Sequence, residues 1–278
     1  MPARDLIFDV GLHRGEDTAF YLALGYRVVA FEANPALIAA CRARFASELA
    51  QGRLTIVEGA VAADGASEAV RFFAAAKSEW GTMNEDLLRE GLRAGVAVEE
   101  IAVPRIGMAA CFERFGVPHY MKIDIEGNDH VAIEALRGVV DRPDYVSFEW
   151  PSTAERMAQT LRTLTELGYQ SFAFVQQALL PDREAVVTAA DGSRRPYRFE
   201  DGASGPFGGD LLQRWVTADA IQRLARIHMA LNHAVGPGGW IEGIPGGWRL
   251  QRAINRRSGY PYPGWFDVHG RRASGGRQ

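Results

Sequence analysis

The chain contains 278 residues, of which 47% are hydrophobic and 23% are charged, and its formal net charge is −3. This composition is typical of a globular protein, and the slightly acidic balance excludes a nucleic-acid binder held by bulk positive charge. No basic segment followed by an apolar stretch opens the chain, and no apolar run approaches the roughly 18 residues of a membrane span. The sequence therefore predicts a cytoplasmic protein without a membrane span.

Strand and helix patterns alternate along the first two thirds of the chain. Apolar, β-branched and aromatic runs predict strands over residues 5–10, 26–31, 53–57, 70–74, 120–125, 145–150 and 169–175. Amphipathic segments predict helices over residues 16–24, 35–49, 108–115, 131–137 and 153–167, and a helix with a loop over 85–100. Because helices of about ten residues separate the strands, we expect an α/β fold with a mostly parallel central sheet and helices on both faces.

The pattern weakens after about residue 179. One more helix is predicted over 216–232, and the chain from Gly236 onward is dense in glycine, proline, tryptophan and arginine. The stretch "YPYPGWFDVHGRR" at 260–272 has too many aromatic residues for a simple disordered tail. We therefore expect a core over 1–180 and a C-terminal extension over 181–278, which packs on the core or on a partner subunit of a homo-oligomer.

A glycine-rich loop, "FDVGLHRG" at residues 8–15, follows the first predicted strand. Glycines let the backbone turn sharply and approach a ligand closely, and open α/β sheets bind ligands beyond the carboxyl ends of their strands. Glu32 ends the second strand about 20 residues after Gly11, where a carboxylate can accept hydrogen bonds from ribose hydroxyls. The two features together predict a site for a cofactor that contains adenosine.

The charge in front of the first glycine distinguishes among such cofactors. The pattern D-x-G-x-x-x-G at Asp9, Gly11 and Gly15 lacks the third glycine of the dinucleotide fingerprint. The Asp9 carboxylate would repel a pyrophosphate, whereas it suits the ammonium and sulfonium charges of S-adenosylmethionine. We therefore favour methyl transfer, and the alternatives are an NAD(P)-dependent oxidoreductase or a non-catalytic protein that binds a nucleotide cofactor.

Three stretches, "DVGLHRGEDT", "VVAFEANP" and "YMKIDIEGND", resemble motifs of the FkbM-type methyltransferases. The resemblance implies a class I, Rossmann-like methyltransferase fold and S-adenosylmethionine as cofactor. The sequence departs from the family pattern at His13, where asparagine is usual, and at Ala33, where proline is common. The resemblance implies adenine contacts just after the third strand. The implied cofactor-binding residues are Asp9, Gly11, His13, Gly15, Glu32, Ala33, Asn34, Gly59, Ala60 and Val61.

The motif "KIDIEGND" supplies the candidate catalytic residues. Strand alternation puts Lys122, Asp124 and Glu126 on one side of the predicted strand, which faces the cofactor crevice. Methyl transfer to a hydroxyl needs a group that accepts the hydroxyl proton, and a carboxylate or a neutral histidine can do so. We expect Asp124 and Glu126 to serve the chemistry with Lys122 as their electrostatic partner. The alternatives are a purely structural salt bridge, or Glu149 or His119 as the base.

Carboxylates at neighbouring strand ends could also hold a divalent cation, but we expect no metal. The loop "AKSEWGTMNED" at 76–86 is predicted to be a lid on the substrate side, in which Trp80 stacks on the acceptor or fills a groove. The expected function is O-methylation of a hydroxyl on a sugar or secondary metabolite. The expected partner is therefore a small-molecule or glycan acceptor, and no nucleic acid.

Overall fold

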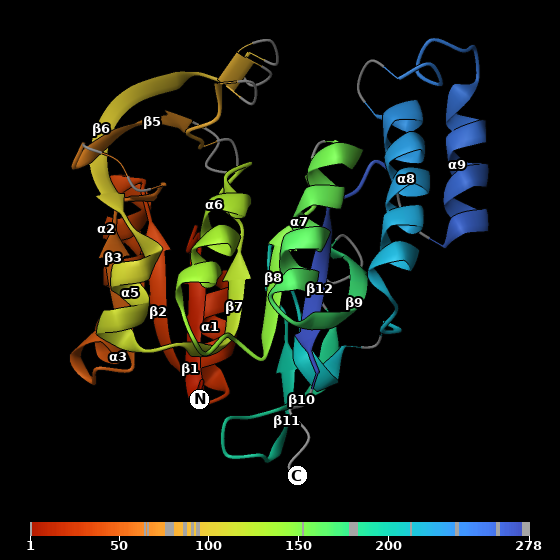
Figure 1. Ribbon diagram of the computed structural model, residues 1–278. Helices are drawn as coiled ribbons and strands as arrows, with labels where there is room; N and C mark the ends of the chain where they lie inside the picture. The colour runs from red at the N-terminus through yellow and green to blue at the C-terminus, as the bar shows by residue number, and fades with distance from the viewer. Residues whose placement is uncertain are drawn as a thin grey trace.

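The protein is described by a computed structural model over residues 2–63, 65, 67–75, 81–85, 88–89, 92, 95–151, 153–177, 183–211, 213–236, 239–259 and 262–273. Its centre is a seven-stranded sheet in the order β3-β2-β1-β7-β8-β12-β9 (Figure 1). The strands are β1 (Ala3–Val10), β2 (Arg27–Glu32), β3 (Leu54–Glu58), β7 (Pro118–Ile123), β8 (Tyr145–Glu149), β9 (Tyr169–Gln176) and β12 (Phe266–Arg272). Only β12 runs antiparallel to its neighbours, which confirms the predicted mostly parallel α/β sheet of the Rossmann-like class.

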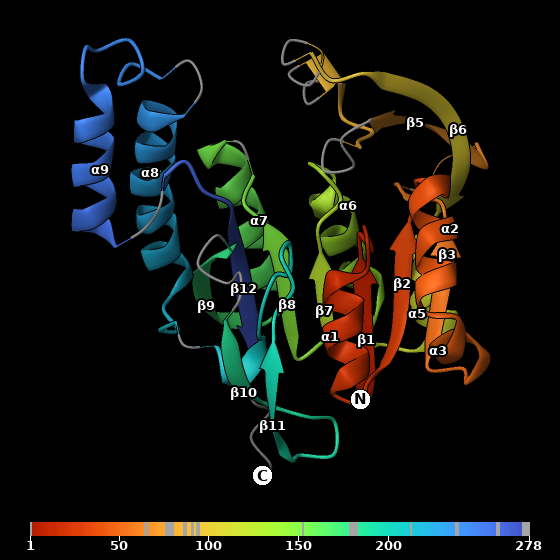
Figure 2. The ribbon, with the colours of Figure 1, turned by 180° about the vertical axis from the view of Figure 1, so that it is seen from behind.

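Helices cover both faces of this sheet (Figures 1 and 2). They are α1 (Glu16–Ala23), α2 (Pro35–Arg44), α3 (Ala46–Ala50), α5 (Met108–Phe115), α6 (Asp129–Glu134), α7 (Ala154–Glu166), α8 (Ala218–Val235) and α9 (Gly247–Ser258), with 3₁₀ helices η2 (Ala135–Gly138) and η4 (Gly208–Asp210). Strand alternation sends Phe8 of β1 into the core under α5, α6 and α7. Its neighbour Ile7 points into the opposite core, under α1 and α2.

The segment predicted as a helix and loop over 85–100 ends in a strand instead. β6 (Val98–Ile106) pairs antiparallel with β5 (Ala69–Ala75) and parallel with the short β4 (Ala60–Val61). The charged pair Glu99 and Glu100 hides the strand alternation in the sequence, and Pro104 argues against a strand interior. Two further boundaries differ from the prediction, because the helix over 35–49 divides at Phe45 and β7 ends at Ile123 rather than at residue 125.

The chain after residue 180 contributes to the central sheet. A hairpin of β10 (Glu184–Thr188) and β11 (Arg194–Arg198) comes first, then α8 and α9, and β12 finally enters between β8 and β9. Sequence reasoning did not predict β12, because Gly270 and four charged or titratable side chains interrupt its apolar pattern. The boundary at residue 180 stays a prediction. Within the described residues, no helix has the length and apolar character needed to cross a bilayer.

Candidate active site

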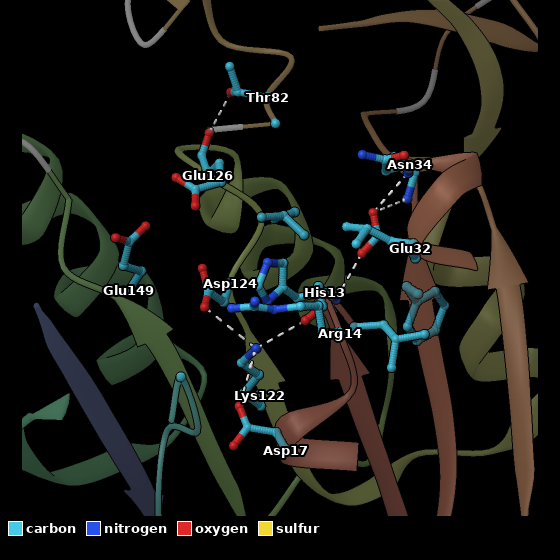
Figure 3. A pocket seen from close by; sticks show the side chains of 18 of the residues that line it. His13, Arg14, Asp17, Glu32, Asn34, Thr82, Lys122, Asp124, Glu126 and Glu149 are labelled. Atoms are coloured by element: carbon cyan, nitrogen blue, oxygen red, sulfur yellow. Dashed lines mark hydrogen bonds and ion pairs between the residues drawn. The ribbon is translucent and has the colours of Figure 1, made fainter. Parts of the chain in front are cut away.

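A cavity of about 710 Å³ opens beyond the carboxyl ends of β1, β2, β7 and β8 (Figure 3). This volume lies within the usual range of small-molecule sites. The position is where an open α/β sheet is expected to bind its ligand. The predicted site residues that line it are Gly11, His13, Glu32, Ala33, Asn34, Gly59, Ala60, Val61, Lys122, Asp124 and Glu126.

At Gly11 the loops after β1 and β7 lie in close contact. Its φ of 102° lies in the region that favours glycine, and a Cβ atom there would lie 1.8 Å from the Asp124 carbonyl oxygen. The Asp124 N–H also donates to the Val10 carbonyl at 2.8 Å. The first glycine of the motif is therefore required by the contact between two loops that both line the cavity.

The other two predicted cofactor residues, Gly15 and Asp9, lie behind the cavity wall. Gly15 is the N-cap residue of α1 with a φ of 85°, and a Cβ atom on it would lie 2.4 Å from the Phe45 ring. Asp9 is completely buried beneath the loop, where its Oδ2 accepts a 2.6 Å hydrogen bond from the Thr18 hydroxyl. Neither residue is among those that line the cavity, so their direct cofactor contacts stay a prediction.

Glu32, the predicted ribose ligand, lines the cavity but is already held by backbone amides. Its Oε1 accepts hydrogen bonds from the N–H groups of Ala33 (2.9 Å) and Asn34 (2.8 Å), and its Oε2 accepts one from His13 (2.9 Å). An ionised carboxylate offers about four acceptor positions, so one remains on Oε2. Burial raises the pKa of Glu32, while the three N–H donors oppose that shift. Glu32 therefore ties the β1 and β2 loops together and keeps one acceptor position for a ligand.

Gly59, Ala60 and Val61 form the wall on the far side of Glu32. The Gly59 N–H donates to the Glu32 carbonyl at 2.8 Å, and its φ is 139°. A Cβ atom on Gly59 would lie 2.3 Å from the Pro104 carbonyl oxygen of β6. The next two residues pair with β6 as β4. This wall is apolar and is continued by Phe72 of β5, which suits a flat, uncharged ring such as adenine.

Lys122 is a buried ammonium surrounded by carboxylates. Its Nζ lies 3.6 Å from Asp9 Oδ1, 3.5 Å from Asp17 Oδ2 and 3.5 Å from Asp124 Oδ2. It also donates a 3.0 Å hydrogen bond to the Gly11 carbonyl. Burial lowers the pKa of Lys122, but the carboxylates, Asp124 first, raise it well above its usual value. The ammonium therefore stays charged and connects the floor of the cavity to the glycine loop.

The same burial acts on the two aspartates beneath Lys122. Desolvation is the largest effect on both, and it raises the pKa of Asp17 as well as that of Asp9, the latter to about 7. Lys122 opposes the shift in each case. Asp17 Oδ1 also accepts a 2.8 Å hydrogen bond from the Ser204 N–H, which fastens the C-terminal part of the chain to the site. Removal of the ammonium would leave two carboxylates in the interior without a counter-charge.

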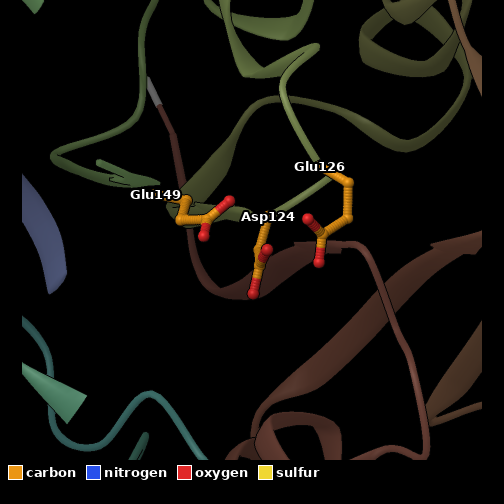
Figure 4. A group of neighbouring side chains, drawn as sticks. All are labelled: Asp124, Glu126 and Glu149. Carbon is orange, nitrogen blue, oxygen red and sulfur yellow. The ribbon is translucent and has the colours of Figure 1, made fainter. Parts of the chain in front are cut away.

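Asp124, Glu126 and Glu149 bring three carboxylates together at the end of β7 and β8 (Figure 4). One oxygen from each lies within 4.8 Å of the other two, and all three residues line the cavity. Asp124 and Glu126 lie beyond the last residue of β7, not within the strand as predicted, and Glu126 has a φ of 49°. Among the described residues, this is the group of acidic side chains whose spacing could also hold a divalent cation.

The surroundings of Glu149 act strongly on its protonation. Burial, followed by the charges of Asp124, Glu126 and other nearby carboxylates, raises the pKa of Glu149 well above its usual value. None of the hydrogen bonds made by the described residues involves the Glu149 carboxyl group, whereas its backbone N–H donates to Asp129 Oδ2 at 2.9 Å. Glu149 is thus a carboxyl group that faces the cavity and binds a proton readily.

Asp129 supports the loops that carry this cluster. Sequence reasoning did not predict this role. Asp129 Oδ1 accepts from the Ile125 N–H at 3.0 Å, while its Oδ2 accepts from the Glu149 N–H, so one buried carboxylate bridges the loops after β7 and β8. Burial raises the pKa of Asp129 to about 7. Its place in the first turn of α6 is ordinary for an acidic residue, so the sequence carried no signal of this second role.

Other residues of the cavity come from distant parts of the chain, and sequence reasoning missed these too. Gln177, Trp265 and the stretch 201–203 line the cavity. Thr82, in contrast, belongs to the loop predicted as a lid; it lines the cavity, and its hydroxyl donates a 2.8 Å hydrogen bond to the Glu126 carbonyl. His119, considered as a base, lies at the opposite end of β7, where its Nδ1 is 2.7 Å from Asp144 Oδ2. Its proposed role as the base is therefore wrong. Trp80 lies outside the described residues.

A family profile described as "Methyltransferase FkbM domain" matches residues 9–171. This match spans more than half of the chain and includes the glycine loop, Glu32 and the three-carboxylate cluster. No curated protein matches the chain significantly.

Several solved structures are similar at low identity. Precorrin-6y C5,15-methyltransferase from Geobacter metallireducens is 15% identical over 71% of this chain and 76% of that chain, with a TM-score of 0.34. The glycopeptide N-methyltransferase MtfA is 11% identical over 98% of this chain and 85% of that chain, with a TM-score of 0.34. An rRNA methylase from Streptococcus thermophilus is 14% identical over 63% of this chain and 79% of that chain, with a TM-score of 0.34.

Proposed function

The chain belongs to the FkbM family of methyltransferases, and on that premise we propose that it methylates a hydroxyl group of a sugar or a secondary metabolite. S-adenosylmethionine is the methyl donor, and a nicotinamide-dependent oxidoreductase or a non-catalytic binding protein is no longer an alternative. The bound cofactor would supply a methyl group on a positively charged sulfur. An acceptor oxygen would attack the methyl carbon, and the sulfur would leave as a neutral thioether. The residues of this chain must bind the cofactor, orient the acceptor and accept its proton.

The cavity fits the cofactor in its volume and in its donor set. Glu32 would accept a hydrogen bond from a ribose hydroxyl at its remaining acceptor position, and the wall at Gly59–Val61 would contact adenine. Gly11 exposes loop backbone close to Lys122 and Asp124, where the charged methionine end would lie. The Asp124 carboxylate, which is only partly engaged by Lys122, would attract the cofactor's ammonium group. Asp9 would act through Lys122 and not by contact.

The three-carboxylate cluster is the observation that carries the choice of a hydroxyl over an amine. Carboxylates at Asp124, Glu126 and Glu149 would hold an amine acceptor as its ammonium form, which has no lone pair with which to attack a methyl group. A hydroxyl acceptor, in contrast, is neutral and donates hydrogen bonds to carboxylates. A carboxyl group with a raised pKa is also a better proton acceptor near neutral pH than an ordinary glutamate.

Glu149 is the residue that we propose as the general base. Its raised pKa supports this role, as does a carboxyl group to which no hydrogen bond is made within the described residues. Glu126 would then position the acceptor, and the charges of Asp124 and Glu126 would keep the Glu149 pKa high. Lys122 would act as an electrostatic support for Asp124, in agreement with the role expected from the sequence.

The mouth of the cavity supports a polyhydroxylated acceptor. Trp265 lines the cavity and is 67% exposed, so a large aromatic face is available to a ligand. Gln177 and Asp201 also line the cavity and bring hydrogen-bonding groups to it. An aromatic face next to hydrogen-bonding side chains suits the ring of a sugar, which has an apolar face and hydroxyls around its edge.

The proposal is tested with tritiated S-adenosylmethionine and a matched panel of acceptors. Free glycosides and sugar nucleotides would be compared with the corresponding amino sugars, and the position of the methyl group would be determined by NMR. We expect an O-methyl product and a loss of labelling in Glu149→Gln. Methylation of the amine only, or labelling of RNA but of no hydroxyl compound, would contradict the proposal.

A further inference from the structure

The α8–α9 hairpin carries a positive charge that the rest of the chain does not share. Residues 218–258 contain six arginines and two carboxylates, although the whole chain has a net charge of −3. Four arginines of α9 are exposed, namely Arg249, Arg252, Arg256 and Arg257. Within the described part of the chain, none of these four forms an ion pair. The hairpin is therefore a basic surface on an otherwise acidic protein.

The four arginines lie on the outward face of α9. Gly247, Gln251 and Asn255, spaced four residues apart, lie on the opposite face, where the two amide side chains donate to the Tyr262 carbonyl at 2.8 and 3.3 Å. Arg252 and Arg249 lie over the exposed ring of Trp248, at 5.8 and 5.2 Å from its centroid. The arginine side chains therefore point to solvent as a continuous stripe with a tryptophan at its edge.

Large apolar side chains are exposed at the tip of the hairpin, which we define as residues 239–248. Trp240 is 61% exposed, Ile244 42% and Trp248 56%. The tip is held firmly, because Ile241 is buried and its N–H donates to the Ala234 carbonyl at 3.1 Å. A Cβ atom on Gly247 would lie 2.0 Å from the Ile241 carbonyl, so the tip also packs closely on itself. These contacts fix the backbone that carries the three exposed side chains.

We propose that the hairpin tip and the arginine stripe of α9 dock on the surface of a membrane that contains anionic lipids. Basic residues beside tryptophan and isoleucine are the combination found where helices lie in the interface of a bilayer. The arginines would contact lipid phosphates, while Trp240, Ile244 and Trp248 would enter the region between headgroups and acyl chains. The contact is peripheral and does not require a membrane span.

Two other partners fit the observations less well. A second copy of the chain, meeting hairpin to hairpin, would bring two arginine stripes together, and like charges in contact are unfavourable. RNA would satisfy the arginines and could stack on the tryptophans, but it gives no reason to expose the aliphatic Ile227, Ile244 and Leu250. A bilayer accounts for both the positive charge and the aliphatic side chains.

The position of the tip relates this surface to the cavity. Figures 1 and 2 draw the turn between α8 and α9 at the same end of the molecule as β5 and β6, away from the N-terminus. Phe72 of β5 lines the cavity at that end, as do Gln177 after β9 and Trp265 before β12. Docking would therefore hold the cavity end of the protein close to the membrane. Membrane docking is independent of the acceptor, because the described residues of 218–258 are absent from the cavity lining.

The test is co-sedimentation of the full chain with vesicles. One set contains phosphatidylcholine alone and the other contains phosphatidylcholine and phosphatidylglycerol in equal parts. We expect binding to the anionic vesicles only, and weaker binding at high salt because salt screens the arginines. Arg252→Gln with Arg256→Gln should weaken binding roughly 25-fold, since each arginine near an anionic surface contributes a factor of about five. Trp240→Ala with Trp248→Ala should also weaken it.

The matched control is Arg4→Gln with Arg114→Gln, which removes the same charge from exposed positions on β1 and α5. Circular dichroism melting would verify that all variants are folded. The proposal is overturned if the native chain ignores anionic vesicles, or if the control loses as much binding as the α9 variant. It is also overturned if light scattering shows self-association that the α9 variant abolishes, or if polyuridylate binds with the same dependence on α9 while vesicles do not. Methyl transfer to a soluble acceptor is measured separately, so a failure here leaves the proposed chemistry intact.

Discussion

Two glutamates in this protein lie at equivalent positions, but their carboxyl groups have different neighbours. Glu32 is the last residue of β2 and Glu149 is the last residue of β8, and both line the same cavity. Three backbone N–H groups donate to the Glu32 carboxylate. Within the described residues, no hydrogen bond reaches the Glu149 carboxyl group, and the charges that raise its pKa are those of other carboxylates.

The comparison shows how the ends of parallel strands can produce two kinds of carboxylate. Backbone donors favour the ionised form of Glu32 and fix its direction, which suits an acceptor of ribose hydroxyls. The neighbouring negative charges disfavour the ionised form of Glu149, which suits proton transfer. Burial raises the pKa of both residues, so the hydrogen bonds and the neighbouring charges, and not burial, separate their roles.

The largest expected effect comes from Glu149. Glu149→Gln keeps the shape of the side chain but cannot accept a proton, so turnover should fall about 10²–10⁴-fold, the usual range for loss of a general base. Cofactor affinity should change little, because Glu149 is not among the residues expected to contact the cofactor. Steady-state kinetics and isothermal titration calorimetry measure the two quantities. Glu155→Gln, at an exposed position of α7, is the matched control.

The pH profile gives an independent readout of the same residue. The base must be ionised, and the pKa of Glu149 lies well above its usual value, so kcat/KM should rise with pH until that pKa is passed. In Glu149→Gln this rise should disappear from the residual activity. If the variant keeps both full turnover and the same pH profile, Glu149 is not the base, and Asp124→Asn becomes the variant to measure.

Lys122 should have the next largest effect, and its effect is on stability. Lys122→Met leaves Asp9 and Asp17 buried without a counter-charge, which costs about 3–5 kcal/mol for buried ion pairs. The loss should be greater at pH 8 than at pH 5, because the raised pKa of Asp9, about 7, lets it take up a proton at the lower pH. Urea denaturation at the two pH values measures this difference.

A suitable comparison for Lys122 is an exposed ion pair. Arg42 pairs with Glu58, and both side chains are about half exposed. Arg42→Met should therefore change the free energy of unfolding by no more than about 1 kcal/mol. Equal losses in the two variants would mean that the carboxylates around Lys122 reach solvent or another cation.

The parts of this molecule that could be predicted from sequence are those with a local signal. Sequence reasoning correctly predicted the strand β1, the loop after it and the end of β2 at Glu32. Periodicity and glycine spacing are signals that act over a few residues. The strands β6 and β12 were not predicted, because Glu99, Glu100 and Gly270 interrupt the apolar alternation of their sequences. Both strands are stabilised by pairing with neighbouring strands. The register of a strand in a sheet is a long-range property that composition does not encode.

The same distinction applies to the site. The alternation of Lys122, Asp124 and Glu126 suggested one charged face, although two of them lie in the loop after the strand. Asp17 was missed because acidic residues are common in the first turn of a helix, so its position did not indicate a role in the site. Trp265 was missed because its place at the cavity depends on β12, more than a hundred residues from β8 in sequence. Motifs therefore predicted cavity-lining residues near the ends of β1, β2 and β7, but not those contributed by the chain after residue 176.

Glu32 should have an intermediate effect, on cofactor affinity. Glu32→Gln offers one acceptor oxygen where the carboxylate offers two, and its amide would face the backbone donors of the two loops. Binding should weaken by about 1.5–3 kcal/mol, the range for hydrogen bonds to a charged group. A cofactor analogue without ribose hydroxyls separates direct contact from loop support. If Glu32 binds the ribose, the variant and the native chain should bind this analogue with similar affinity.

The smallest effect is expected for Gly15. Its substitution tests whether this motif residue contacts the cofactor or only supports the loop. Gly15→Ala places a Cβ atom 2.4 Å from the Phe45 ring, at a φ of 85° that alanine adopts at a cost. The variant should lose about 1–3 kcal/mol of stability, and its affinity for the cofactor in the folded state should hardly change. Phe45→Leu in the same chain should recover part of the stability, because the smaller side chain relieves the contact. Thermal melting and calorimetry at a temperature where both variants are folded measure the two quantities.

If Gly15→Ala loses cofactor affinity but no stability, Gly15 contacts the cofactor directly, as the motif alone suggested. The wall behind the glycine loop must then open when the cofactor binds.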